Sequence, residues 1–426
     1  MSDRVPGFNT RAIHAGAAPD ATTGARATPI YQTTSFVFDD VDHAASLFGL
    51  QAFGNIYTRI GNPTCAVLEE RVAALEGGTA ALAVASGHAA QHLVFHTLME
   101  AGDEFVAARQ LYGGSINQFG HAFKKCGWNV VWADIDDLST FENAVTQKTK
   151  AIFVESIANP GGKITDIEAI SKIARRAGVP LIVDNTLASP YLCRPIEHGA
   201  DIVIHSATKF LGGHGNSIGG VIVDAGSFNW SREGRYPTLS EPCASYNGMV
   251  LHETFGNFAF AIACRVLGLR DFGPALSPFN AFLIINGIET LPLRMQRHCE
   301  NAQAVAEFLS DHPNVAWVNY AGLPGDRHHK LAQKYCPKGA GAVFTFGVKG
   351  GYDAGVKVVS NVQLLSHLAN VGDTRSLIIH PASTTHRQLS EQQRESAGAG
   401  ADVVRLSVGI EDKADIIADL DQALRG

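Results

Sequence analysis

The feature that most constrains the fold of this chain is a series of seven short apolar runs, separated by longer stretches with helical spacing. The runs are Ala80–Ala85, Phe105–Ala108, Val130–Ala133, Ala151–Val154, Leu181–Val183, Ile202–Ile204 and Val221–Val223. Short apolar strands that alternate with helices indicate an α/β fold with a mostly parallel sheet, covered by helices on both faces. Ligands of such sheets bind beyond the carboxyl ends of the strands. Polar residues that end an apolar run are therefore the first candidates for a functional site.

The spacing of the elements divides the chain into three parts. Residues 1–62 have many turn formers and little periodic pattern, which is unusual inside a compact domain. We therefore expect an N-terminal arm that lies across another subunit. Residues 63–275 are expected to form the main α/β domain, and residues 276–426, where strand and helix signals resume, a smaller C-terminal α/β domain.

Two segments stand apart from this alternation. Polar and aromatic residues from Phe228 to Gly273 predict a long insertion over the functional site. The run from Phe279 to Leu309 predicts one long helix or two joined helices, with Pro292 as a kink or boundary.

The composition excludes several kinds of partner and site. A net charge of -7 without a basic run argues against nucleic acid or an anionic membrane as the main partner. The first residues have no signal-peptide pattern and no later stretch is apolar for 18 residues, so we expect a cytoplasmic protein. The 7 cysteines are scattered without a CxxC pair, which predicts neither a disulfide framework nor a zinc site, and we expect no metal.

The stretch from Asp201 to Gly220, DIVIHSATKFLGGHGNSIGG, holds the strongest candidate for chemistry. Lys209 is flanked by apolar residues, which suits a partly buried amine better than a solvated surface charge. Burial lowers the pKa of a lysine and makes its lone pair available as a nucleophile. The alternative is a lysine without a role at a strand end, beside a Gly-rich loop.

Asp184 ends the run Pro180-Leu-Ile-Val and lies 25 residues before Lys209. An aspartate at this position can simply begin a turn or cap a helix. Paired with a lysine at the end of a later strand, it suggests pyridoxal phosphate. The aldehyde of this cofactor needs an amine, and its ring nitrogen needs a carboxylate to stay protonated and withdraw electrons from the substrate.

The segment Leu82–Ala90, which contains Ser86, Gly87 and His88, reads as a strand, a tight turn and a helix start, which would offer unpaired N–H groups to a phosphate. The alternative is an ordinary N-cap serine. Ser206 and Thr208 could add hydroxyl donors. The chain has no P-loop and no glycine fingerprint of a dinucleotide fold, so a nicotinamide-dependent dehydrogenase is disfavoured.

These residues, in this order, resemble the family of pyridoxal-phosphate enzymes of cysteine and methionine metabolism, which have fold type I. The resemblance runs from about Thr10 to the C-terminus and rests on YTRIGNPT, ASGHAA, LYGGS, ESIANPGG, VDNTLASP, HSATKFLGGHG, HPASTTH and RLSVGIE. Within the family, the chain is most similar to the O-acetylhomoserine sulfhydrylase branch. That similarity rests on HPASTTHRQLS, LANVGDTRSL, SPFNAFLIINGIETL and the insertion after Phe228.

The resemblance implies a role for each matching position. Lys209 would be the Schiff-base lysine and proton shuttle, and Asp184 the partner of the ring nitrogen. The implied phosphate ligands are Ser86, Gly87, His88, Ser206 and Thr208, joined by Tyr57 and Arg59 from a neighbouring subunit. The remaining positions are Tyr112, which stacks on the ring and helps move protons, Asn159, near the phenolic oxygen, and Arg405 and Asn370, which bind the substrate. Asn370 departs from the serine of many relatives, and His88 from their methionine or glutamine.

The implied reaction is a γ-replacement in methionine biosynthesis, in which O-acetyl-L-homoserine and sulfide give L-homocysteine and acetate. O-acetylserine, methanethiol, cysteine and a succinyl leaving group stay open. The alternatives within the family are a cystathionine γ-synthase and a methionine γ-lyase. A non-catalytic binding protein is disfavoured because Lys209 and Asp184 are both present. The family also implies a homo-oligomer, a tetramer, with sites shared between subunits.

Overall fold

The computed structural model describes residues 5–232, 234–385, 387–388, 390–396 and 398–426. The chain forms two compact units. The first contains the described part of Met1–Glu100 together with Asp201–Thr208 and Asn216–Glu289, and the second contains Ala101–Ala200, Lys209–Gly215 and Thr290–Gly426. The chain therefore passes between the units at five peptide bonds, one of which joins Thr208 to Lys209.

The first unit is built on three antiparallel strands, with β7 (Gly220–Asp224) between β1 (Ala80–Val84) and β6 (Ile202–Ser206). Val84 and Ser206 both pair with Gly220, so the carboxyl ends of β1 and β6 lie on either side of the start of β7. Helices α3 (Pro63–Glu76) and α4 (Gly87–Leu98) pack on these strands. The order of the strands therefore brings the segment after β1 close to the end of β6.

The second unit contains four parallel strands in the order β5-β4-β2-β3. They are β2 (Glu104–Ala108), β3 (Asn129–Ala133), β4 (Thr149–Glu155) and β5 (Leu181–Asp184), and the helices between them are α5 (Gly113–Asn117), α6 (Leu138–Ala144) and α7 (Ile167–Ala177), with α8 (Ser189–Leu192) after β5. Strand β4 is buried along its whole length. Glu155 and Asp184 pair at the carboxyl ends of β4 and β5.

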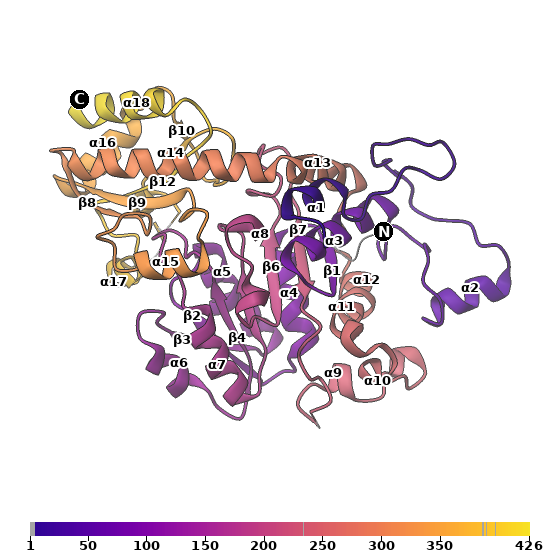
Figure 1. The fold of residues 1–426 in the computed structure, drawn as a ribbon. Coiled ribbons are helices and arrows are strands. Elements are labelled where there is room, and N and C mark those ends of the chain that lie inside the picture. Colours follow the sequence, from indigo (N-terminus) through magenta and orange to yellow (C-terminus); the bar gives the residue numbers. More distant parts are fainter. Residues whose placement is uncertain (1–4, 233, 386, 389, 397) are drawn as a thin grey trace. The chain divides into compact units, whose positions relative to one another are not determined.

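A second sheet of the same unit has the order β10-β11-β12-β9-β8. Its strands are β8 (Val315–Asn319), β9 (Val343–Val348), β10 (Ser366–His367), β11 (Leu377–Ile379) and β12 (Val403–Ser407). The helices of this part are α14 (Leu291–Asp311), α15 (His329–Tyr335), α16 (Gly351–Asn361), α17 (Glu391–Ser396) and α18 (Lys413–Arg425). Helices α14, α16 and α18 pack together beside the sheet (Figure 1).

All seven predicted strands are present, and the sheet signals of the C-terminal region correspond to β8, β9 and β12. One strand departs from the parallel pattern, because β7 is antiparallel to both of its neighbours. No crossover helix joins β6 to β7 in the part of the chain that the structure describes, and a parallel connection would need one.

The predicted long helix after Ser277 is two helices, α13 (Pro278–Glu289) and α14, which are separated at Thr290. Pro292 lies in the first turn of α14, where its missing N–H costs no helical hydrogen bond. The predicted boundary is therefore confirmed.

The insertion after Phe228 folds into short helices, α9 (Pro237–Ser240), α10 (Leu251–Phe255), α11 (Ala259–Ala263) and α12 (Arg270–Phe272), with a π-helical turn at Cys264–Leu269. Three aromatic side chains form its core, because Trp230 stacks on Phe260 at 5.2 Å and meets Tyr236 edge-on at 5.3 Å. The insertion packs on α4.

The N-terminal segment is less irregular than its sequence predicts, since it contains α1 (Phe8–His14) and α2 (Val41–Phe48). Each helix is at most 8 residues long, which is too short for a clear helical period in the sequence. Asp40 caps α2 by accepting a hydrogen bond of 2.7 Å from the N–H of His43. None of the described helices combines the length and the apolar character needed to cross a membrane.

Candidate active site

The predicted phosphate ligands of the first unit meet where β1, β6 and β7 come together. Ser86 caps α4, and its hydroxyl accepts a hydrogen bond of 3.1 Å from the N–H of Ala89. A Cβ added at Gly87 would lie 2.9 Å from the Cβ of Ser206, so the first turn of α4 lies directly against the end of β6. His88 is exposed and follows Gly87 in the first turn of α4.

Two further observations support an anion-binding site at the N-terminus of α4. A Cβ at Gly220 would lie 2.1 Å from the carbonyl oxygen of Ser86, so only glycine allows this approach. The hydroxyl of Thr208 donates to the carbonyl oxygen of Gly219 at 3.2 Å and accepts from its N–H at 3.1 Å. The hydroxyl is thereby fixed at the position where the chain leaves β6.

Lys209 belongs to a hydrogen-bonded group in the second unit. Its Nζ donates to Oδ1 of Asn370 at 2.5 Å. The guanidinium of Arg405, on β12, donates to the backbone oxygen of Asn370 and to Oδ1 of Asn159, both at 3.2 Å. The structure therefore brings together four residues that the sequence singled out separately.

The surroundings of Lys209 favour its neutral amine. Burial, reinforced by the positive charge of Arg405, lowers the pKa of Lys209 to about 8. Burial also lowers the pKa of Arg405, to about 10, so this guanidinium stays charged at neutral pH. A lysine that loses its proton near neutral pH can act as a nucleophile and as a base.

The loop after Lys209 is held by a second arginine, which the sequence did not reveal. Arg294, buried in the first turns of α14, donates to the carbonyl oxygens of Phe210 at 2.8 Å and Leu211 at 3.3 Å. A Cβ at Gly372 would lie 2.7 Å from the N atom of Phe210, so the loop that carries Asn370 also packs closely on this backbone.

The carboxyl ends of β4 and β5 place two carboxylates side by side. Asp184 accepts a hydrogen bond of 3.0 Å from the N–H of Thr186. Its partner in the register, Glu155, accepts from the N–H of Tyr112 at 2.7 Å and from the N–H of Asn159 at 2.9 Å. Burial, and then the neighbouring Asp184, raise the pKa of Glu155 well above its ordinary value.

Glu155 was missed in the sequence, although the rule that found Asp184 also applies to it. Each residue ends a buried strand with a carboxylate, and Glu155 begins the segment ESIANPGG. Tyr112 as a whole residue is 44% exposed, and its backbone N–H is held by Glu155.

Tyr57 and Arg59 lie in the first unit, on the segment before α3. The guanidinium of Arg59 lies 5.4 Å from the ring centroid of Tyr57 and also donates to the carbonyl oxygen of Arg270. Both side chains are exposed in the isolated chain.

Part of the predicted motif HPASTTHRQLS is described. His380 donates or accepts through its two ring nitrogens, with the hydroxyl of Ser383 at 3.0 Å and the carbonyl oxygen of Ala401 at 2.8 Å. His386 and Leu389 of this motif lie outside the described residues.

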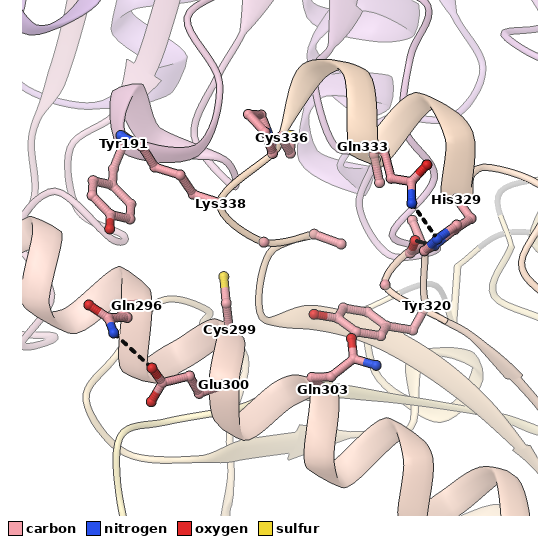
Figure 2. A pocket seen from close by; sticks show the side chains of 16 residues that line it. Tyr191, Gln296, Cys299, Glu300, Gln303, Tyr320, His329, Gln333, Cys336 and Lys338 are labelled. Carbon is pink, nitrogen blue, oxygen red and sulfur yellow. Dashed lines mark hydrogen bonds between the residues drawn. The ribbon is translucent and has the colours of Figure 1, made fainter. Parts of the chain in front are cut away.

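A cavity of about 560 Å³ in the second unit lies apart from these residues. Figure 2 shows that its wall includes Tyr191, Cys299, Glu300 and Tyr320, and the lining contains none of the predicted site residues. Two pairs of its polar side chains bond to each other, Gln296 to Glu300 at 2.9 Å and Gln333 to His329 at 3.0 Å. We therefore do not assign the candidate active site to this cavity.

The residues present fit pyridoxal phosphate by their chemistry. The second unit offers an amine of lowered pKa, a carboxylate at a strand end and a half-exposed aromatic ring. The first unit offers a capped helix start that glycines leave open to an anion. Among the described residues, no group of three or more metal-ligating side chains is placed to hold a metal ion.

Comparison with known proteins agrees with this chemistry. A family model described as Cys/Met metabolism PLP-dependent enzyme matches residues 9–425. An O-acetyl-L-homoserine sulfhydrylase of Leptospira meyeri is 53% identical over 425 residues, which cover 98% of this chain and 96% of that protein. A homocysteine synthase of Schizosaccharomyces pombe is 52% identical over 419 residues, 98% of either chain.

A solved structure from Campylobacter jejuni has the same fold. It bears the name O-acetylhomoserine (thiol)-lyase and contains a pyridoxyl-lysine-5'-monophosphate. Its TM-score is 0.96 at 40% identity, over 99% of this chain and 100% of that chain.

Proposed function

This chain belongs to the Cys/Met metabolism PLP-dependent enzyme family, and we propose that it converts O-acetyl-L-homoserine and sulfide into L-homocysteine and acetate. The observation that carries this proposal is 53% identity over 98% of the chain to an O-acetyl-L-homoserine sulfhydrylase. The product is a precursor of methionine, so the enzyme would serve methionine biosynthesis.

When bound, pyridoxal phosphate supplies an aldehyde that condenses with amines and a ring that withdraws electrons from the bound amino acid. Lys209 would hold the aldehyde in the resting enzyme. The substrate amine then replaces it, and the released Nζ of Lys209 takes the proton from Cα and later returns it. The lowered pKa of Lys209 supports this role, because a base must be neutral at the operating pH.

Arg405 would bind the α-carboxylate of the substrate. A guanidinium can offer two parallel N–H groups to the two carboxylate oxygens, which lysine cannot do. Its present partners, the side chain of Asn159 and the backbone of Asn370, hold the guanidinium in place. Asn370 would line the same subsite and keep the Nζ of Lys209 near it.

The remaining residues would bind the cofactor. Asp184 would keep the ring nitrogen protonated, Tyr112 would stack on the ring and help move protons at Cβ and at the leaving acetate, and Asn159 would approach the phenolic oxygen. The N-terminus of α4, with Ser86, Gly87 and His88, would bind the phosphate together with the hydroxyls of Ser206 and Thr208.

We further propose that Tyr57 and Arg59 bind the phosphate of a neighbouring subunit, and that the active form is a cytoplasmic homotetramer. The exposure of both side chains in the isolated chain supports this assignment, as does their position on the N-terminal arm. The arm also exposes large apolar side chains, which a second subunit would cover.

The purified protein with added pyridoxal phosphate tests the proposal. Incubation with O-acetylhomoserine and sulfide is expected to release homocysteine, and parallel reactions with methanethiol, cysteine, O-acetylserine and O-succinylhomoserine rank the nucleophiles and leaving groups. If homocysteine does not form, and methionine instead gives ammonia and a 2-oxo acid, the enzyme is a γ-lyase. If cystathionine forms much faster from cysteine than homocysteine forms from sulfide, it is a cystathionine γ-synthase.

A further inference from the structure

Glu155 is a buried carboxylate at the edge of the candidate site. It is the last residue of β4, and only 5% of its surface is exposed. None of the ion pairs among the described residues involves this carboxylate. A buried carboxyl group without an ion pair is costly unless hydrogen bonds satisfy its oxygens, so the partners of Glu155 decide what it does.

The two oxygens of this carboxylate have different backbone partners. Oε1 accepts the N–H of Tyr112, at the start of α5, and Oε2 accepts the N–H of Asn159, in the loop after β4. One side chain thus ties together two loops that are 47 positions apart in the sequence (159 minus 112). Glu155 bonds to the backbones of Tyr112 and Asn159 and not to their side chains.

The geometry of this arrangement uses both oxygens of Glu155 as hydrogen-bond acceptors. Two N–H donors need two acceptor oxygens, and a glutamine would offer one oxygen and one NH₂ group. The amide would therefore face one of the two N–H groups with a donor. Glu155 also lies beside Asp184, so a change of its charge alters the field at that carboxylate.

We propose that Glu155 is a positioning residue, which fixes Tyr112 and Asn159 against the cofactor by holding both backbones and which adjoins the ring-nitrogen partner Asp184. The inference rests on the proposed function only for the roles of Tyr112, Asn159 and Asp184. It adds a residue that acts through all three.

The test compares Glu155→Gln with Asp419→Asn. Asp419, on α18 in the same unit, is also a buried carboxylate that accepts backbone N–H groups, from Gln363, Leu364 and Leu365 at 2.8 to 2.9 Å. Either substitution turns an acceptor oxygen into a donor against a backbone N–H. The two variants are therefore matched in the kind of bond lost, and they differ in its place.

Three quantities separate positioning from support of the fold. These are the dissociation constant of pyridoxal phosphate from the apoenzyme, the visible circular dichroism of the bound cofactor without substrate, and kcat and KM. For Glu155→Gln we expect the dissociation constant to rise about tenfold, because one buried N–H loses its acceptor. We also expect a changed dichroism band and a kcat lower by about 100-fold, because small misplacements at a reacting centre cost that much.

Asp419→Asn is expected to lower the melting temperature and to leave the dichroism band of the cofactor unchanged. The dissociation constant of pyridoxal phosphate and kcat should stay within about twofold of the wild type, roughly the scatter of a neutral change. Glu155→Asp, which keeps both oxygens, should recover part of kcat. If Glu155→Gln retains the wild-type band, affinity and kcat, the proposal is wrong. The band and the affinity are measured without substrate, so failure to form homocysteine would overturn the proposed function and leave this result standing.

If Glu155→Gln does not fold, amide hydrogen exchange of the wild-type protein tests the proposal instead. Uptake of pyridoxal phosphate should then slow amide hydrogen exchange at Tyr112 and Asn159 together, by about tenfold, whereas residues 363–365 keep their rates. Exchange that is unchanged by the cofactor at both positions would overturn the proposal.

Discussion

At the scale of single residues, burial and a neighbouring charge together lower the pKa of Lys209. Lys209 has a pKa of about 8 instead of the ordinary 10.5, first because it is buried and second because Arg405 is positively charged. The shift disfavours the ammonium form. The neutral amine therefore predominates from about pH 8 upward, whereas an ordinary lysine reaches that state only above pH 10.5. Uptake of an aldehyde by the apoenzyme requires that neutral amine.

We therefore predict that the rate of pyridoxal phosphate uptake by the apoenzyme rises with pH and levels off above a midpoint near the pKa of Lys209, about 8. In Arg405→Gln the positive charge is gone, so the midpoint should move to higher pH while staying below 10.5, because the effect of burial remains. Absorbance stopped-flow from pH 6.5 to 10 measures both midpoints.

The matched control for this shift is Arg425→Gln, at the exposed end of α18, where the arginine pairs with Asp421. Its midpoint should equal that of the wild type. Ionisation of the cofactor itself is common to all three proteins, so only a difference between them counts. A midpoint in Arg405→Gln that stays in place or moves to lower pH would contradict the electrostatic coupling.

At the scale of elements, the loop after Lys209 depends on glycines and on one helix. Gly213 has a φ of +75°, and a Cβ there would lie 2.1 Å from Nη1 of Arg294. That guanidinium is buried and bonded to Phe210 and Leu211, so it cannot give way at low cost. Helix α14 thereby holds the backbone that follows Lys209.

We predict that Gly213→Ala destabilises the apoenzyme by about 1 to 3 kcal/mol, the range for overpacked and strained sites. Gly325→Ala, also in the second unit, should change stability by no more than about 0.5 kcal/mol, because nothing lies within 4 Å of a Cβ there. Urea unfolding gives both values. Equal losses in the two variants would show that Arg294 moves aside freely and does not hold the loop.

The elements also show what the sequence reveals about a site. Strands β1 to β6 follow from short apolar runs, and Glu155, Asp184 and Ser206 follow as polar residues that end such runs, because the burial of a short segment is recorded in its own residues. The antiparallel direction of β7 and the 2-residue strand β10 could not be predicted from the sequence, because distant segments determine which strands pair. Arg294 and Glu155 act on the backbones of other segments, and a sequence pattern does not record such bonds.

At the scale of the whole molecule, the isolated chain leaves its arm incompletely buried. Val37 is 96% exposed, Val41 82% and Phe53 84%, and Figure 1 shows α2 at the end of a segment that stands away from the other helices of its unit. Such apolar exposure is typical of a surface that another molecule covers. The irregular pattern of residues 1–62 predicted an arm, but the identity of what it covers depends on a second chain.

We predict that two inactive variants restore activity when they are mixed. If Arg59 acts in a neighbour's site and Lys209 in its own, a mixed dimer of Arg59→Ala and Lys209→Ala has one site with both lesions and one with neither. Random reassembly of equal amounts makes half of the dimers mixed, so about a quarter of the sites should work. The measurement is homocysteine formation after joint unfolding and refolding, compared with each variant treated alone.

The control uses two lesions that lie in the same unit of one chain. Lys209 and Arg405 both bond to Asn370, so in a mixed dimer of Lys209→Ala and Arg405→Gln every site keeps one lesion, and no recovery is expected. Recovery in the first mixture and not in the second requires that Arg59 crosses to a neighbour. If neither mixture recovers although mixed dimers are demonstrated by mass, Arg59 does not act in a neighbour's site, and the shared-site proposal is wrong.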